Sequence, residues 1–184
     1  MNMAKTKGFT LIELLITIVV VSVLLAAGVP SLMEFIKNNK LTAQANSLVA
    51  AIQVTRSEAV KRGTFMVICA KSPDDVTCSG DNDWTNGWIV FSDLDQQGDL
   101  DGNGNCTAAD DNNTKDCVQR TITAQGNNTL TSNASSIQFQ PDGQAANAAA
   151  TTFTLTADDC KQQQVRGITI TRQGHATIAK QDCP

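Results

Sequence analysis

The hydrophobic and polar positions divide the chain into three stretches with different patterns. The first is an apolar run from Phe9 to Val29, in which Glu13 is the single charged residue. A helix needs about 20 apolar residues to span a bilayer, so this run predicts a transmembrane helix. A carboxylate in such a run costs roughly 2.5–3.5 kcal/mol at the helix centre. The segment offers Glu13 no partner, so we expect one from outside it.

The second stretch continues the helix in amphipathic form. Pro30 lacks a backbone donor and is expected to kink the helix rather than end it, because helix-compatible sequence follows. Gly63 is the expected stop. Apolar positions recur at steps of three and four, which predicts one buried helical face. That face comprises Leu41, Ala45, Leu48, Ile52, Thr55 and Ala59.

The third stretch alternates short β-type runs with Gly, Asn and Asp, and so predicts an antiparallel sheet. The turn signals at residues 141–143 (PDG) and 172–174 (RQG) agree with this interpretation. Residues 93–115 are too polar to bury and predict a long surface loop. The expected strands are Thr64–Lys71, Gly87–Asp93, Val118–Thr123, Ile137–Gln140, Thr152–Thr156, Val165–Thr171 and Ala176–Ala179.

The residues ahead of the apolar run follow an unusual order. A secretory signal places its small-residue cleavage site after the apolar stretch, whereas here Gly8 precedes it and follows Lys5 and Lys7. With Phe9 and Glu13, this order resembles the class III signal of type IV pilins and type II secretion pseudopilins. The resemblance implies that a prepilin peptidase cuts after Gly8 and that Phe9 is N-methylated. An ordinary signal anchor is the alternative.

The same resemblance names partners and a location. It implies that Glu13 pairs with the terminal amine of a neighbouring subunit during assembly. The implied partners are other major and minor pilins, contacted through the N-terminal helix, the prepilin peptidase and the inner-membrane assembly platform. The protein would span the inner membrane once, with a periplasmic domain, and would reach the cell surface in a pilus after assembly.

A narrower resemblance covers most of the chain and is to the GspH/FimT family of minor pilins. It rests on Gln53–Ala59, Cys69, Cys78, Trp84, Gly87–Asp93, Phe139–Gly143, Gly167–Ile170, Gly174 and Cys183. The family implies an α+β fold, with a long N-terminal helix, half transmembrane and half amphipathic, packed on a two-sheet antiparallel β domain. The corresponding segments are a leader (1–8), a transmembrane helix (9–29), its amphipathic continuation (30–62) and a periplasmic domain (63–184).

The family also implies a low-abundance subunit that helps to initiate pilus assembly and lies at or near the filament tip. A type II secretion minor pseudopilin of the H type, a DNA-uptake pilin and a surface adhesin remain alternatives. The aromatic residues of the motif, Trp84, Trp88 and Phe91, are expected to be core residues, because aromatic side chains on a strand most often face a hydrophobic core.

Six cysteines follow the membrane segment, which indicates an oxidising compartment. Six cysteines allow fifteen pairings. The spacing favours the local set Cys69–Cys78, Cys106–Cys117 and Cys160–Cys183. A zinc site is the competing interpretation, but the chain has no CxxC pair and a single histidine, His175.

The charge balance argues against DNA as a partner. The formal net charge is −4 and becomes −6 without Lys5 and Lys7, whereas phosphate binding relies on excess Lys and Arg. Some relatives bind DNA through a glycine-arginine-x-arginine stretch, but the corresponding residues 174–177 read GHAT. Arg166, Arg172 and Lys180 could bind DNA weakly if they formed one exposed patch.

The sequence suggests no enzyme and one cofactor. Recognisable nucleotide-binding, hydrolase and zinc motifs are missing, and His175 follows a turn glycine. The acidic loop matches the EF-hand spacing, with a final Asp in place of the usual Glu, and so predicts a calcium site. Its ligands would be Asp99, Asp101, Asn103, Asn105 and Asp110, with Asp93 and Asp95 as substitutes in another register.

Overall fold

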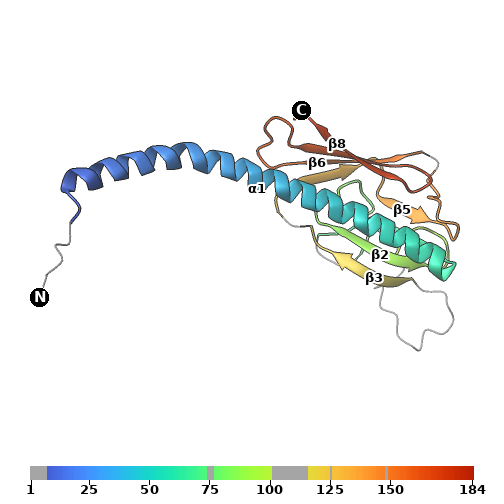
Figure 1. Ribbon diagram of the computed structural model, residues 1–184. Coiled ribbons are helices and arrows are strands. Elements are labelled where there is room, and N and C mark those ends of the chain that lie inside the picture. Colours follow the sequence, from blue (N-terminus) through green and yellow to red (C-terminus); the bar gives the residue numbers. More distant parts are fainter. Residues whose placement is uncertain (1–7, 74–76, 101–115, 125, 148) are drawn as a thin grey trace, which may run out of the picture. The chain divides into compact units, whose positions relative to one another are not determined.

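The computed structural model describes residues 8–73, 77–100, 116–124, 126–147 and 149–184. These residues form one helix and eight strands (Figure 1). They divide into two compact units, residues 1–39 and 40–184, and the helix contributes to both. The elements are α1 (Leu11–Arg62), β1 (Phe65–Ala70), β2 (Trp88–Asp93), β3 (Cys117–Ile122), β4 (Thr129–Ser132), β5 (Ser136–Phe139), β6 (Thr151–Thr156), β7 (Val165–Ile170) and β8 (Ala176–Gln181).

The first unit is the apolar part of α1. The helix continues through Pro30, as expected. Its apolar side chains are exposed, with Leu11 at 78% and Leu24 at 66%. Among the described residues, α1 is the one helix long and apolar enough to cross a membrane. The exposed apolar surface therefore requires lipid or other protein chains to cover it.

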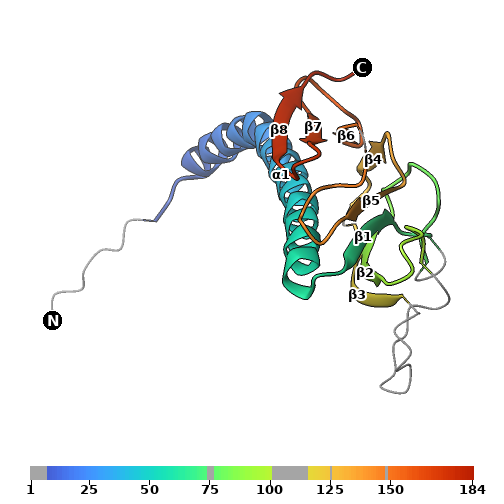
Figure 2. The same cartoon turned by 90° about the vertical axis from the view of Figure 1, so that its right-hand side faces the viewer.

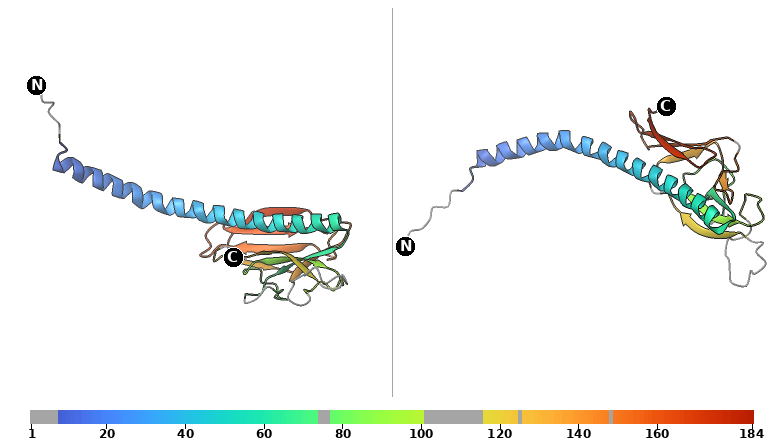
Figure 3. Two further views of the ribbon diagram at one scale, coloured as in Figure 1. Left: turned by 90° about the horizontal axis from the view of Figure 1, so that it is seen from below. Right: turned by 45° about the vertical axis from the view of Figure 1, so that its right-hand side comes forward.

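In the second unit, the amphipathic part of α1 lies over two antiparallel sheets (Figures 2 and 3). The strand orders are β3-β2-β1-β5 and β4-β6-β7-β8. The predicted inner face of the helix is confirmed, because five of its six residues are fully buried and Ala45 is 1% exposed. Both sheets contribute side chains to the same core.

Seven of the eight strands coincide with predicted ones, and β4 was missed. Its sequence, TLTS, has one apolar residue, Leu130, and therefore no alternation of its own. The strand exists because it pairs with β6, where Leu130 lies opposite Leu155. Pairing between distant segments overrode a weak local signal.

The expected core aromatics are all buried: Trp84 in the segment before β2, and Trp88 and Phe91 on opposite faces of β2. Trp84 packs edge-on against Phe153 with ring centroids 5.0 Å apart, and this contact ties the segment before β2 to strand β6. Trp88 faces the helix and the main core. Phe91 lies on the opposite face with Val67 and other apolar residues, because successive strand residues point to opposite sides.

Candidate functional site

A helix cap, which was not predicted from the sequence, lies in the N-terminal segment. Thr10 precedes the first residue of α1, and its Oγ1 accepts a hydrogen bond from the Glu13 N–H at 3.3 Å. In return, Glu13 Oε2 accepts one from the Thr10 N–H at 3.5 Å. This reciprocal pair is a capping box, which satisfies two donors of the first helical turn. The expectation that its own segment offers Glu13 no partner is therefore wrong.

The cap leaves Glu13 available for a second role. Its side chain is exposed, and its negative charge lies at the positive end of the helix dipole. Cleavage after Gly8 would create a new amine on Phe9, one residue before the capping Thr10. The carboxylate can therefore hold the helix start and meet an external cation at the same place.

Two of the predicted disulfides are confirmed. Cys69 bonds to Cys78, and Cys160 bonds to Cys183, with Cα atoms 5.7 and 5.9 Å apart. Cys117 is also disulfide-bonded. Its predicted partner, Cys106, lies outside the described residues.

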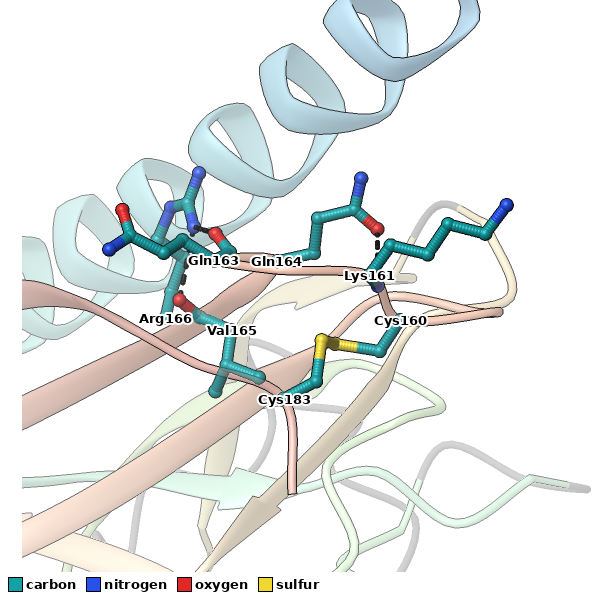
Figure 4. Close-up of a disulfide and its surroundings, with 7 residues drawn as sticks. All are labelled: Cys160, Lys161, Gln163, Gln164, Val165, Arg166 and Cys183. Carbon is teal, nitrogen blue, oxygen red and sulfur yellow. Dashed lines mark hydrogen bonds between the residues drawn. A yellow bond between two sulfur atoms is a disulfide. The ribbon is translucent and has the colours of Figure 1, made fainter. Parts of the chain in front are cut away.

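The Cys160–Cys183 bond ties the chain end to the loop between β6 and β7 (Figure 4). Beside the bond, the Cys183 N–H donates to the Gln162 carbonyl at 3.0 Å. The last strand, β8, is a sheet edge whose side chains are mainly exposed. The disulfide therefore anchors an edge strand that little packing holds.

The three basic residues considered for DNA binding do not form one exposed patch. Arg166 is only 3% exposed, and its Nη1 donates to the carbonyls of Gln163 and Val165 at 2.8 and 3.0 Å (Figure 4). Lys180 is exposed, and its backbone lies opposite that of Arg166 in the register of β7 and β8. Arg172 is exposed at the far end of this hairpin, roughly 20 Å from Arg166 at about 3.3 Å per strand residue. The geometry gives a nucleic acid no continuous basic surface here.

The predicted calcium loop is mostly outside the described residues. Asp99 is exposed, whereas Asp101, Asn103, Asn105 and Asp110 are not described. The calcium prediction therefore stays a prediction.

A different group of acidic residues comes together at the end of β2. Carboxylate oxygens of Asp93, Asp95 and Asp116 lie within 4.8 Å of one another. Asp93 and Asp95 were considered in the sequence, but Asp116 was missed. No local spacing links Asp116 to the other two, since it reaches them only through the pairing of β2 with β3.

Asp93 is the buried member of this acidic group. Its oxygens accept hydrogen bonds from the N–H groups of Gln96 at 2.7 Å and Gly98 at 3.0 Å, and from the Gln138 side chain. Burial raises the pKa of Asp93, and a hydrogen bond with Asp95 raises it further, although the three N–H donors oppose this shift. These donors occupy most of the lone pairs of the carboxylate. Asp93 therefore holds the backbone of residues 96–98, which follow β2, in place.

Two family profiles match the chain. The profile of the type II transport protein GspH matches residues 44–174. That of the prokaryotic N-terminal methylation motif matches residues 3–29. None of the curated protein sequences matches.

Solved structures from two bacteria are similar to this chain to different degrees. Two crystal forms of the type IV minor pilin FimU of Pseudomonas aeruginosa PAO1 are 20% and 19% identical to this chain, with TM-scores of 0.54 and 0.51. The first alignment covers 79% of this chain and 92% of FimU. The minor pseudopilin EpsH from the type 2 secretion system of Vibrio cholerae is 11% identical, with 77% and 97% coverage and a TM-score of 0.48. At these identities, the likeness to FimU shows a shared fold.

Proposed function

The chain belongs to the family of the type II transport protein GspH, and on this premise we propose that it is a minor pilin that helps to initiate a type IV pilus and lies at or near its tip. The observation that carries the proposal is the first unit of the structure. There, a match to the N-terminal methylation motif runs into a helix whose apolar side chains are exposed. Such a surface suits a subunit that is stored in a membrane and then packs against other helices.

The proposed cycle begins in the inner membrane. The prepilin peptidase cuts after Gly8, and the new terminal residue, Phe9, is methylated. The apolar part of α1 spans the bilayer once, and the second unit remains in the periplasm. The assembly platform then moves the subunit into a filament, where its helix packs against those of other pilins and reaches the cell surface.

Glu13 has a distinct task in this cycle. A lipid environment penalises its charge, and the capping box offers only a backbone N–H in return. The methylated amine of a neighbouring subunit would neutralise the charge during assembly. The carboxylate would thus favour entry of the subunit into the filament over its return to lipid.

Three variants separate charge pairing from helix capping. Glu13→Gln keeps the side chain that a capping box accepts but removes the charge. Thr10→Ala weakens the cap by about 1 kcal/mol and keeps the charge. Glu13→Ala removes both. If charge pairing drives assembly, both Glu13 variants reduce the number of pili per cell, and Thr10→Ala does not.

Counting pili by electron microscopy, with the amount of protein in the membrane as a control, measures this effect. None of the variants should change the melting temperature of the second unit. Full piliation of Glu13→Gln together with loss in Thr10→Ala would show that the cap is what assembly requires. Labelling of the protein along the whole filament would contradict the tip location.

The alternative is a minor pseudopilin of a type II secretion system. The name of the matching family favours it, and both machines use the same kind of N-terminal segment. Deleting the gene should reduce pilus number and leave protein secretion intact if the main proposal is right. The opposite result would assign the chain to secretion.

A further inference from the structure

The two sheets of the second unit have four edge strands, and three of these are covered or irregular. At β4, the Trp84 N–H donates to the Leu130 carbonyl at 2.8 Å, so the segment before β2 covers this edge. At β5, the Ala146 N–H donates to the Gln138 carbonyl at 2.8 Å. The register of β3 with β2 shifts after Val90, which makes that edge irregular. Covers and irregularities of this kind keep an edge from pairing with another chain.

The fourth edge, β8, is regular. All six of its residues pair with β7 in an unbroken register, and the strand contains no proline. A turn in which the Thr171 N–H donates to the His175 carbonyl at 2.9 Å holds one end, and the Cys160–Cys183 bond anchors the other. The strand therefore keeps its extended shape without a partner on its outer side.

The register identifies the backbone groups of β8 that face outward. Because Thr171 and His175 form a hydrogen-bonded pair, such pairs recur at every second position along β7 and β8. The N–H and carbonyl groups of Ala176, Ile178 and Lys180 then point away from β7. Within the described part of the chain, no backbone hydrogen bond outside the sheet involves these three residues. They offer donors and acceptors at the spacing that another strand would match.

The side chains beside this edge indicate what would pair with it. Ile178 is 42% exposed and lies opposite the core residue Ile168, so it extends the apolar face of the sheet to its rim. Lys180 lies on the same face, is exposed and is the only charged residue of β8. It forms no ion pair with the residues that the structure describes. An added strand would therefore suit an apolar side chain next to Ile178 and an acidic one next to Lys180.

We propose that β8 binds an extended segment of a partner protein as an additional antiparallel strand, the more stable of the two pairings. In this mode of recognition, main-chain hydrogen bonds supply affinity and alternate side chains supply specificity. The segment would carry an acidic residue two positions before an apolar one, to meet Lys180 and Ile178 in turn. The inference concerns the second unit alone and is independent of the assembly role proposed for the N-terminal helix.

A tethered strand tests this proposal in the full-length protein in lipid nanodiscs. A flexible Gly/Ser linker of about twelve residues follows Pro184 and carries the strand TETVTVTS, whose glutamate falls opposite Lys180 and whose first valine falls opposite Ile178. The tether keeps the strand at an effective concentration in the millimolar range. The matched control, TETPTPTS, has the same charge but lacks the two N–H groups that would face β8.

Hydrogen exchange of single amides, measured by NMR, reports the pairing. Without an added strand, the amides of Thr177 and Ala179 should exchange slowly, because they face β7, and those of Ile178 and Lys180 should exchange quickly. TETVTVTS should slow exchange at Ile178 and Lys180 by about tenfold or more, because each amide gains a hydrogen bond. TETPTPTS should not.

Two further changes test the side chains and the edge itself. The strand TKTVTVTS should protect less than TETVTVTS, and Lys180→Glu should restore its protection. Ile178→Pro removes the central donor of the edge and spares the bonds to β7, so it should abolish protection at Lys180. Slow exchange at Ala179 is the control that β8 remains paired with β7 in this variant. If Ala179 exchanges quickly there, the charge reversal decides the question.

The proposal is overturned if TETVTVTS and TETPTPTS give equal exchange rates, or if charge reversal changes nothing. It is also overturned if Ile178 and Lys180 exchange slowly without an added strand at every protein concentration, since the chain itself would then cover the edge. Protection that appears without an added strand and grows with protein concentration would assign the edge to a second copy of this chain. That result would equally overturn the partner proposed here.

Discussion

Arg56 Nε, on the last turns of α1, donates a hydrogen bond of 2.8 Å to the Gly143 carbonyl, in the turn that follows β5. Three residues earlier on the helix, Gln53 Nε2 donates to the Gly174 carbonyl at 2.8 Å, in the turn between β7 and β8. One helical face thus holds a turn from each sheet. These contacts give a structural reason for the family motifs around residues 53–59, 139–143 and 174.

The first prediction concerns Gly174, which has a φ of 76°. Replacement by Ala would place Cβ 2.6 Å from Arg56 Cδ and 2.8 Å from Nε, the atom that donates to Gly143, so relieving the clash displaces that donor. Gly174→Ala should therefore lower the free energy of unfolding by about 2–4 kcal/mol, combining backbone strain with a lost charged hydrogen bond. Denaturant titration measures this.

Gly80→Ala is the matched control, because Gly80 has a φ of 75° and open space around its Cβ position. It should cost only the backbone strain, about 1–2 kcal/mol. Equal losses in the two variants would mean that the contact with Arg56 contributes nothing.

The second prediction is that the mature protein begins with methylated Phe9. Mass spectrometry of protein extracted from membranes measures the N-terminus directly. Cells without prepilin peptidase should retain residues 1–8. An intact leader in cells with active peptidase, or a cut beyond Val29, would contradict the processing scheme.

The third prediction concerns the pH dependence of stability at Asp93. Because its folded pKa is raised, the native state holds this proton more tightly than the unfolded chain, whose pKa is about 3.9. Its contribution to stability is therefore greatest below pH 4 and is lost as the pH rises through the folded pKa.

Asp93→Asn removes this titration. As the pH falls from 7 to 4, the unfolding free energy of the wild type should rise relative to that of Asp93→Asn. Asp142→Asn makes the same chemical change at an exposed residue and is therefore the control. A difference that stays constant with pH would show that Asp93 does not hold a proton more tightly in the folded state.

The fourth prediction is that the Cys160–Cys183 bond protects the edge strand β8. The two cysteines are 23 residues apart, and closing a loop of that size stabilises a protein by roughly 3 kcal/mol in the chain-entropy model. The double substitution of both by Ser should lower stability by about that amount. Hydrogen exchange should quicken in β8 and remain slow in β1, whose residues are nearly all buried. Uniformly faster exchange would contradict this local role.

The fifth prediction is the calcium site of the acidic loop. Extracellular sites of this kind bind at about 10⁻⁴–10⁻³ M, so millimolar calcium should raise the melting temperature and a chelator should reverse the rise. Asp99→Ala combined with Asp101→Ala should abolish the effect. A rise that survives this double substitution but disappears with Asp116→Ala would place the ion at Asp93, Asp95 and Asp116 instead.

The sequence by itself determined the features that depend on local spacing. Steps of three and four placed Leu41, Leu48 and Ile52 on one face of a helix, and Gly63 marked its end. Short separations also predicted the Cys69–Cys78 bond. These features were predictable because neighbouring residues fix backbone periodicity and loop closure without reference to the rest of the chain.

Only the tertiary structure decided the features that join distant segments. The four-residue strand β4 exists through its pairing with β6, and Asp116 approaches Asp93 through the pairing of β2 with β3. Likewise, Trp84 Nε1 donates to a backbone carbonyl, whereas Trp88 Nε1 has no acceptor among the residues that the structure describes. Both tryptophans are predicted as core residues by the same local pattern. Which of them keeps an unpaired donor depends on backbone atoms fifty residues away, and no local pattern carries that information.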